Sequence, residues 1–92
     1  MKLTDKVTIP AEVMARQVGE ETVILDLASG TYFGLDPVGA RIWELLGEGR
    51  MLAEVCEVML DEYEVSRKEL EGDLAELLDA LVDKSLIKIE ST

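Results

Sequence analysis

Residues 22–43 read TVILDLASGTYFGLDPVGARIW, and this stretch decides the fold. Near its start, Val23, Leu25 and Leu27 alternate with Ile24 and Asp26. Because successive side chains of a strand point to opposite faces, the alternation predicts a strand over residues 22–28.

The second half of the stretch turns back and begins a helix. Ser29 and Gly30 read as a two-residue hairpin turn, because Gly30 can take a positive φ, and residues 31–35 return as a strand. Asp36 can then cap a helix, and Pro37 suits the first helical position, where its missing N–H costs nothing. The stretch therefore predicts a hairpin that leads directly into a helix.

Two more helices follow. Apolar residues at helical spacing predict one from about Met51 to Tyr63. Ser66 and Glu69 form the capping-box pattern that begins the next helix. The apolar stripe of this last helix covers an arc of roughly 140°, which is wide for a helix that packs on one neighbour only. The stripe consists of Leu70, Leu74, Leu77, Leu78, Leu81 and Val82.

The ends of the chain are patterned more weakly. Residues 13–18 could form a first strand beside the hairpin, and residues 7–9, which Pro10 ends, read as an edge segment or an ordered tail. Residues 86–89 could form a short strand. The elements together predict an α+β, winged helix-turn-helix-like fold with a three-stranded antiparallel sheet followed by three helices, in one domain over residues 1–92.

The charge of the chain limits its partners. The 92 residues carry a formal net charge of −11 and include no histidine. Such a surface repels phosphate groups, so we expect neither nucleic acid nor anionic membranes as partners. The sequence shows no apolar run of membrane-spanning length and no signal-peptide pattern. These features, with a single cysteine, predict a cytoplasmic protein.

Few residues could carry chemistry. Without histidine there is no nucleophile–histidine pair and no convincing zinc site. Cys56 lies within the apolar stripe of the second helix, which favours a thiol in the core. Asp26 is either a surface residue or a partner in a structural hydrogen bond or salt bridge, with Arg16 or Arg41 as candidates. The sequence predicts no enzyme, no metal and no cofactor.

The returning strand, residues 31–35, lies at the edge of the predicted sheet. It is apolar and contains no lysine or proline that would block pairing with another strand. Tyr32 and Phe33 point to opposite faces, so one faces the core and the other is covered, exposed or offered to a ligand. An added peptide would gain backbone hydrogen bonds worth ~0.5–1.5 kcal/mol each and would meet the leucines of the third helix.

The ordered combination of these residues resembles a known family. It consists of LDLASGTYFGLDPVGARIW at residues 25–43, LDEYEV at residues 60–65, and Asp73 with the leucines that follow it. The chain is similar to the PqqD-like leader-peptide recognition elements of ribosomal natural-product pathways. They include the D-type proteins of pyrroloquinoline quinone biosynthesis and the stand-alone leader-binding proteins of lasso-peptide clusters. The form GLDPVGA at residues 34–40 is more similar to the lasso branch.

The resemblance implies how a partner binds. The leader peptide of a precursor docks as a strand antiparallel to the third strand, with its side chains against the third helix. It is then handed to a separate, transglutaminase-like cysteine protease. In the alternative quinone branch, the protein presents its precursor to a radical SAM enzyme. Carried onto this chain, the peptide-binding residues are Thr31, Tyr32, Phe33, Gly34, Leu35, Arg67, Leu70, Glu71, Leu74, Leu77 and Leu78. The chain departs from the family at Ser85, where glycine is common.

Two rival functions use the same elements. A winged-helix DNA-binding module would read DNA with the third helix, but that helix carries Arg67, Lys68 and Lys84 against six acidic residues and would be repelled. An accessory subunit would instead pair its edge strand with an enzyme and never touch the substrate.

Overall fold

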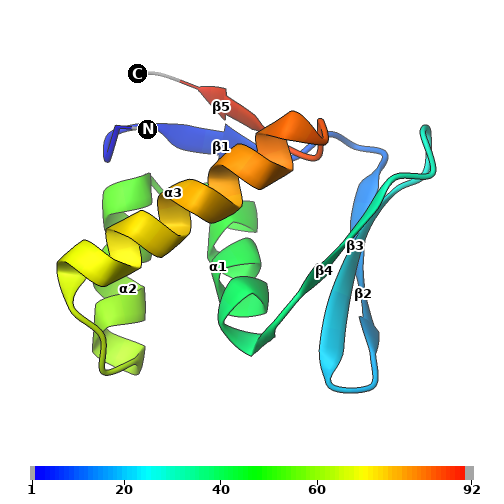
Figure 1. Cartoon of the computed structure of the whole chain (residues 1–92). Coiled ribbons are helices and arrows are strands. Elements are labelled where there is room, and N and C mark those ends of the chain that lie inside the picture. The colour runs from blue at the N-terminus through cyan, green and yellow to red at the C-terminus, as the bar shows by residue number, and fades with distance from the viewer. Residues whose placement is uncertain (1, 91–92) are drawn as a thin grey trace.

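The computed structural model describes residues 2–90 and confirms a three-stranded antiparallel sheet followed by three helices (Figure 1). Two short strands near the ends of the chain form a second sheet. The strands are β1 (Lys6–Thr8), β2 (Val13–Val18), β3 (Glu21–Asp26), β4 (Tyr32–Leu35) and β5 (Lys88–Glu90), and the helices are α1 (Pro37–Gly47), α2 (Leu52–Glu62) and α3 (Arg67–Asp83). No helix of the described residues is long and apolar enough to cross a membrane.

The connection between β3 and β4 is longer than the predicted two-residue turn, which is therefore wrong. The strand ends at Asp26, whose carboxylate accepts hydrogen bonds from the Ala28 N–H at 3.0 Å and from the Ser29 hydroxyl at 2.9 Å. An aspartate that binds the backbone two residues ahead favours a turn over further strand. Asp26 thus forms a structural hydrogen bond within its own loop. Gly30 takes the expected positive φ, at +74°.

The helices begin where their caps predict. The Asp36 carboxylate accepts a hydrogen bond from the Gly39 N–H at 2.7 Å, and Pro37 is the first residue of α1. The Ser66 hydroxyl accepts one from the Glu69 N–H at 3.1 Å at the start of α3. Because Asp36 directly follows β4, its cap holds the end of that strand against the helices.

The second sheet joins the two ends of the chain. β1 and β5 pair antiparallel, with Lys6 opposite Glu90 and Thr8 opposite Lys88 (Figure 1). The chain reaches β5 through Ser85, which has a φ of +59°. The Leu86 N–H donates to the Leu81 carbonyl at 2.9 Å, as in a Schellman helix end. Serine therefore occupies a left-handed position that glycine adopts more easily.

The apolar core lies between the inner face of the three-stranded sheet and the helices. Ile24 is the sheet residue that is fully buried, and Trp43 and Cys56 are buried on the helices, as the sequence predicts. Burial also raises the pKa of the Cys56 thiol, which disfavours the reactive thiolate form. The other buried apolar residues are Val7, Val13, Leu35, Ile42, Leu45, Leu46, Leu52, Val55, Met59, Leu70, Leu74, Leu78, Leu81, Leu86 and Ile87.

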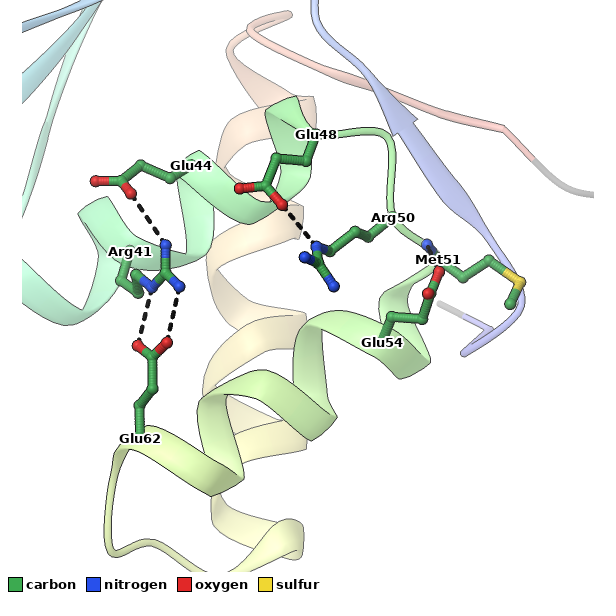
Figure 2. A network of polar contacts seen from close by, with 7 residues as sticks. All are labelled: Arg41, Glu44, Glu48, Arg50, Met51, Glu54 and Glu62. Carbon is green, nitrogen blue, oxygen red and sulfur yellow. Dashed lines mark hydrogen bonds and ion pairs between the residues drawn. The ribbon is translucent and has the colours of Figure 1, made fainter.

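An arginine on α1 ties that helix to α2 (Figure 2). The Arg41 guanidinium donates to both carboxylate oxygens of Glu62, from Nε at 2.9 Å and from Nη2 at 2.7 Å, and to Glu44 at 3.1 Å. The hydrogen bonds from Arg41 lower the pKa of the Glu62 carboxyl. Arg41 is thus engaged between the helices, and the alternative of an ion pair with Asp26 is wrong.

Candidate functional site

β4 is the last strand of the three-stranded sheet, so within residues 2–90 one side of its backbone has no neighbouring strand. The Asp26 N–H donates to the Thr31 carbonyl at 2.8 Å. Residues of an antiparallel pair alternate between hydrogen-bonded and non-hydrogen-bonded positions. Counting from Thr31, the backbone of Phe33 bonds to β3, whereas Tyr32 and Gly34 direct their N–H and C=O groups to the free edge.

The side chains of β4 settle which aromatic residue faces the helices. Phe33 is half-buried and packs against the core, and Leu35 on the same face is buried, with 4% of its surface exposed. Tyr32 is 71% exposed on the opposite face. The two faces of β4 therefore offer different surfaces, one toward α3 and one toward solvent.

A groove with a volume of about 440 Å³ lies beside β4. Its walls come from β4, from the first turns of α1 and from the middle of α3, which crosses in front of α1 in Figure 1. We call it the β4–α3 groove. It is lined by Phe33, Gly34, Leu35, Asp36, Val38, Gly39, Ile42, Asp73, Glu76 and Leu77. An unpaired strand edge thus borders a hollow that could receive side chains.

The groove is partly apolar and carries acidic charge. Phe33, Val38 and Leu77 supply apolar lining, whereas Asp73 and Glu76 supply exposed carboxylates on α3. The lining includes no lysine or arginine. The surface therefore suits an extended ligand with apolar groups and no negative charge.

The structure places the predicted peptide-binding residues in four settings. Phe33, Gly34, Leu35 and Leu77 line the groove together, and Tyr32 lies at the strand edge beside them. Three leucines are instead buried in the core. The two charged residues form ion pairs: Arg67 pairs with Glu71 at 3.6 Å and also with Glu57 on α2. The buried leucines are Leu70, Leu74 and Leu78. Thr31 lies in the loop before β4, where its hydroxyl and the Ser29 hydroxyl are hydrogen-bonded to one another. Which of these residues touch a peptide stays a prediction.

Sequence reasoning missed the contribution of α1 and the acidic residues of α3. Val38 and Gly39 reach the groove because α1 begins immediately after β4. Asp73 and Glu76 precede Leu77 by four and by one residue, so a helical wheel centred on Leu77 would have found Asp73 on the same face.

The outer face of the three-stranded sheet is a second apolar surface. Met14, Val18, Leu27 and Tyr32 are exposed there. A shallow hollow of about 220 Å³ is lined by Met14, Arg16, Val18, Val23, Leu25 and Leu27. We call this surface the outer sheet patch. It faces away from the β4–α3 groove, because Tyr32 and Phe33 point to opposite sides of β4.

Among residues 2–90 no group of three histidine, cysteine, aspartate or glutamate side chains could hold a metal ion. The Cys56 thiol is buried and has no histidine near it, because the chain contains none.

Comparison with known proteins gives a family and two similar structures. The family model of coenzyme PQQ synthesis protein D (PqqD) matches residues 21–87. The solved structure of TbiB1 in complex with the TbiA(beta) leader peptide is 44% identical, with a TM-score of 0.79, and the match covers 87% of this chain and 93% of that one. Lasso peptide synthetase B1 complexed with the leader peptide is 30% identical, with a TM-score of 0.81, over 90% of this chain and 98% of that one.

No curated protein sequence matches the chain. The family match nevertheless covers β3, β4 and all three helices, which are the elements that build the groove. The similar structures extend the likeness to most of the chain. The chain belongs to the PqqD family, in agreement with the resemblance of its hairpin and helices.

Proposed function

We propose that this chain is a non-catalytic binding protein for the leader peptide of a ribosomally made precursor, of the kind that becomes a lasso peptide. The observation that carries the proposal is the unpaired edge of β4 beside the β4–α3 groove. Two solved relatives of the same fold are complexes with leader peptides, which supports the same class of ligand here.

The leader would add as a strand antiparallel to β4. Its backbone would bond to the free N–H and C=O groups of Tyr32 and Gly34. Its residues opposite Phe33 and Leu35 would direct their side chains to the helix side of the sheet, because paired residues share a face. The leader would thus lay alternate side chains in the groove.

The binding free energies expected from the β4 edge and from the groove indicate that the leader would need both. Two edge residues offer up to four backbone hydrogen bonds of ~0.5–1.5 kcal/mol each, or roughly 2–6 kcal/mol in total. Micromolar binding requires about 8 kcal/mol. Apolar contacts with Phe33, Val38 and Leu77 would supply the remainder, and these contacts would also select the sequence of the leader.

After capture, the leader would be delivered to a separate cysteine protease that removes it. The outer sheet patch leaves a second apolar surface accessible while the groove holds the leader. Alternatively, the chain would present its precursor to a radical SAM enzyme of pyrroloquinoline quinone synthesis, an alternative that the match to coenzyme PQQ synthesis protein D supports. The enzyme that co-purifies with the loaded chain distinguishes the two.

Fluorescence polarisation of the labelled leader of the cognate precursor, identified from the gene neighbourhood, tests the proposal. Gly34→Pro removes one edge N–H, whereas Gly34→Ala keeps the N–H, adds a Cβ that meets no atom within 4 Å, and serves as the matched control. We expect micromolar binding by the chain and by Gly34→Ala, and a loss of tenfold or more in Gly34→Pro. Absence of binding at tens of micromolar by the unaltered chain would refute the proposal.

A further inference from the structure

Two carboxylates lie on the α3 wall of the groove, whose own lining includes no lysine or arginine, although Lys68 lines the adjoining hollow on α3 with them. Asp73 and Glu76 are exposed and line the groove beside Leu77. No ion pair found within residues 2–90 includes either of them. The ion pairs that are found join Arg41 to Glu44 and Glu62, Arg50 to Glu48, and Arg67 to Glu57 and Glu71. Three of the chain's arginines are thus engaged elsewhere.

Exposed acids alone would say little, because such side chains are usually solvated. These two differ because they border a hollow that also carries apolar lining and an unpaired strand edge. A peptide strand that added to β4 would cover them and remove part of their water. Covering a carboxylate without giving it a partner costs free energy, and a cation on the peptide offsets that cost.

The spacing of a docked strand matches the spacing along α3. Residues two apart in a strand point to the same face and lie ~6.6–6.8 Å apart. Asp73 and Leu77 are four residues apart, about one helical turn, or roughly 5.4–6 Å along the same face of α3. One docked side chain could therefore rest on Leu77 while the next on that face reaches the carboxylates.

We propose that the segment added to β4 carries a lysine or arginine two residues from an apolar side chain, and that the basic group pairs with Asp73 and Glu76. The inference rests on the proposed function and names the class of peptide that the groove accepts. A segment with glutamate or aspartate at that position is rejected, because it would lie against two carboxylates on a chain whose net charge is −11.

The test compares two doubly neutralised variants that lose the same charge. Asp73→Asn with Glu76→Gln alters the groove. Asp61→Asn with Glu64→Gln alters exposed acids outside the groove lining and is the matched control. The probe is the same leader peptide labelled with fluorescein, measured by polarisation at low and at high ionic strength.

We expect the groove variant to bind the leader about five- to tenfold more weakly at low ionic strength, and the control to stay within about twofold. The difference should shrink at high ionic strength, because salt screens exposed charges. A leader in which the basic residue is replaced by glutamine should lose affinity for the unaltered chain and no further affinity for the groove variant.

Two other outcomes would overturn the inference in distinguishable ways. If the unaltered chain and the groove variant bind the leader equally well, the charge of the leader does not contribute to binding. The inference then fails, and the proposed function stands. If the unaltered chain does not bind the leader, both the inference and the proposed function fail.

Discussion

Ser85 is the residue at which the backbone is under the clearest strain. Its φ of +59° lies in the left-handed region, which costs an L-residue roughly 1–2 kcal/mol. Glycine avoids that cost but loses more freedom on folding, so we expect Ser85→Gly to raise the free energy of unfolding by about 0.5–1 kcal/mol.

Chemical denaturation measures the effect of Ser85→Gly. The neighbouring Lys84 has an ordinary φ of −93°, so Lys84→Gly should lower stability and is the control. An unchanged or lower midpoint for Ser85→Gly would show that Ser85 is not strained.

Substitutions of two leucines of α3, one turn apart, should affect different properties: one the stability of the fold and the other the binding of the leader. Leu74 is 1% exposed in the core, whereas Leu77 is half-buried and lines the groove. Leu74→Ala should cost about 2–5 kcal/mol of stability. Leu77→Glu should keep the fold and weaken leader binding, because it adds charge to the groove. Thermal melts and leader titrations check both; a Leu77→Glu variant that binds the leader normally would exclude Leu77 from the binding surface.

At the scale of elements, local signals predict where helices begin. Asp36 and Ser66 cap α1 and α3 through hydrogen bonds within a few residues, so sequence alone locates them. The loop after β3 was mispredicted because the Asp26 side chain competes with the strand ladder, which the alternating pattern does not reveal. The pairing of β1 with β5 joins residues from opposite ends of the chain, so no local pattern contains it.

The sequence likewise predicts one wall of the candidate site, β4, better than the other, α3. The edge position of β4 follows from strand order, and Phe33 and Leu35, which the sequence predicts as peptide-binding residues, line the groove. The width of the leucine stripe suggests that much of α3 faces a ligand. In the structure, however, Leu70, Leu74 and Leu78 of this stripe are buried in the core. Amphipathic patterns report which residues avoid water and do not separate core from groove.

The link between α1 and α2 predicts how stability depends on pH. The pKa of Glu62 is lowered by Arg41, so the stabilisation is fully present above the ordinary carboxyl pKa of ~4.3 and is lost as pH falls through the lowered value. Glu62→Gln should therefore lower the melting temperature slightly at neutral pH, and by less in acid. Thermal melts across pH test this, with Asp61→Asn as the control; a difference independent of pH would contradict it.

For the whole molecule, the net charge of −11 predicts that added salt changes stability and leader binding in opposite directions. Added salt screens the repulsion among the acidic residues, so the melting temperature should rise with ionic strength. Binding of a leader with a basic side chain should weaken over the same range. Melts and leader titrations in the same salt series test this; two responses of the same sign would contradict the proposed charge pairing.

The central claim, that a leader adds as a strand to the edge of β4, is tested most directly by amide hydrogen exchange. The Tyr32 and Gly34 N–H groups face the open edge, whereas those of Phe33 and Leu35 face β3. We predict that saturating leader slows exchange at Tyr32 and Gly34 and changes Phe33 and Leu35 little, since these are protected already. Bound leader that leaves Tyr32 and Gly34 exchanging as fast as before, or that protects β2 instead, would contradict the account.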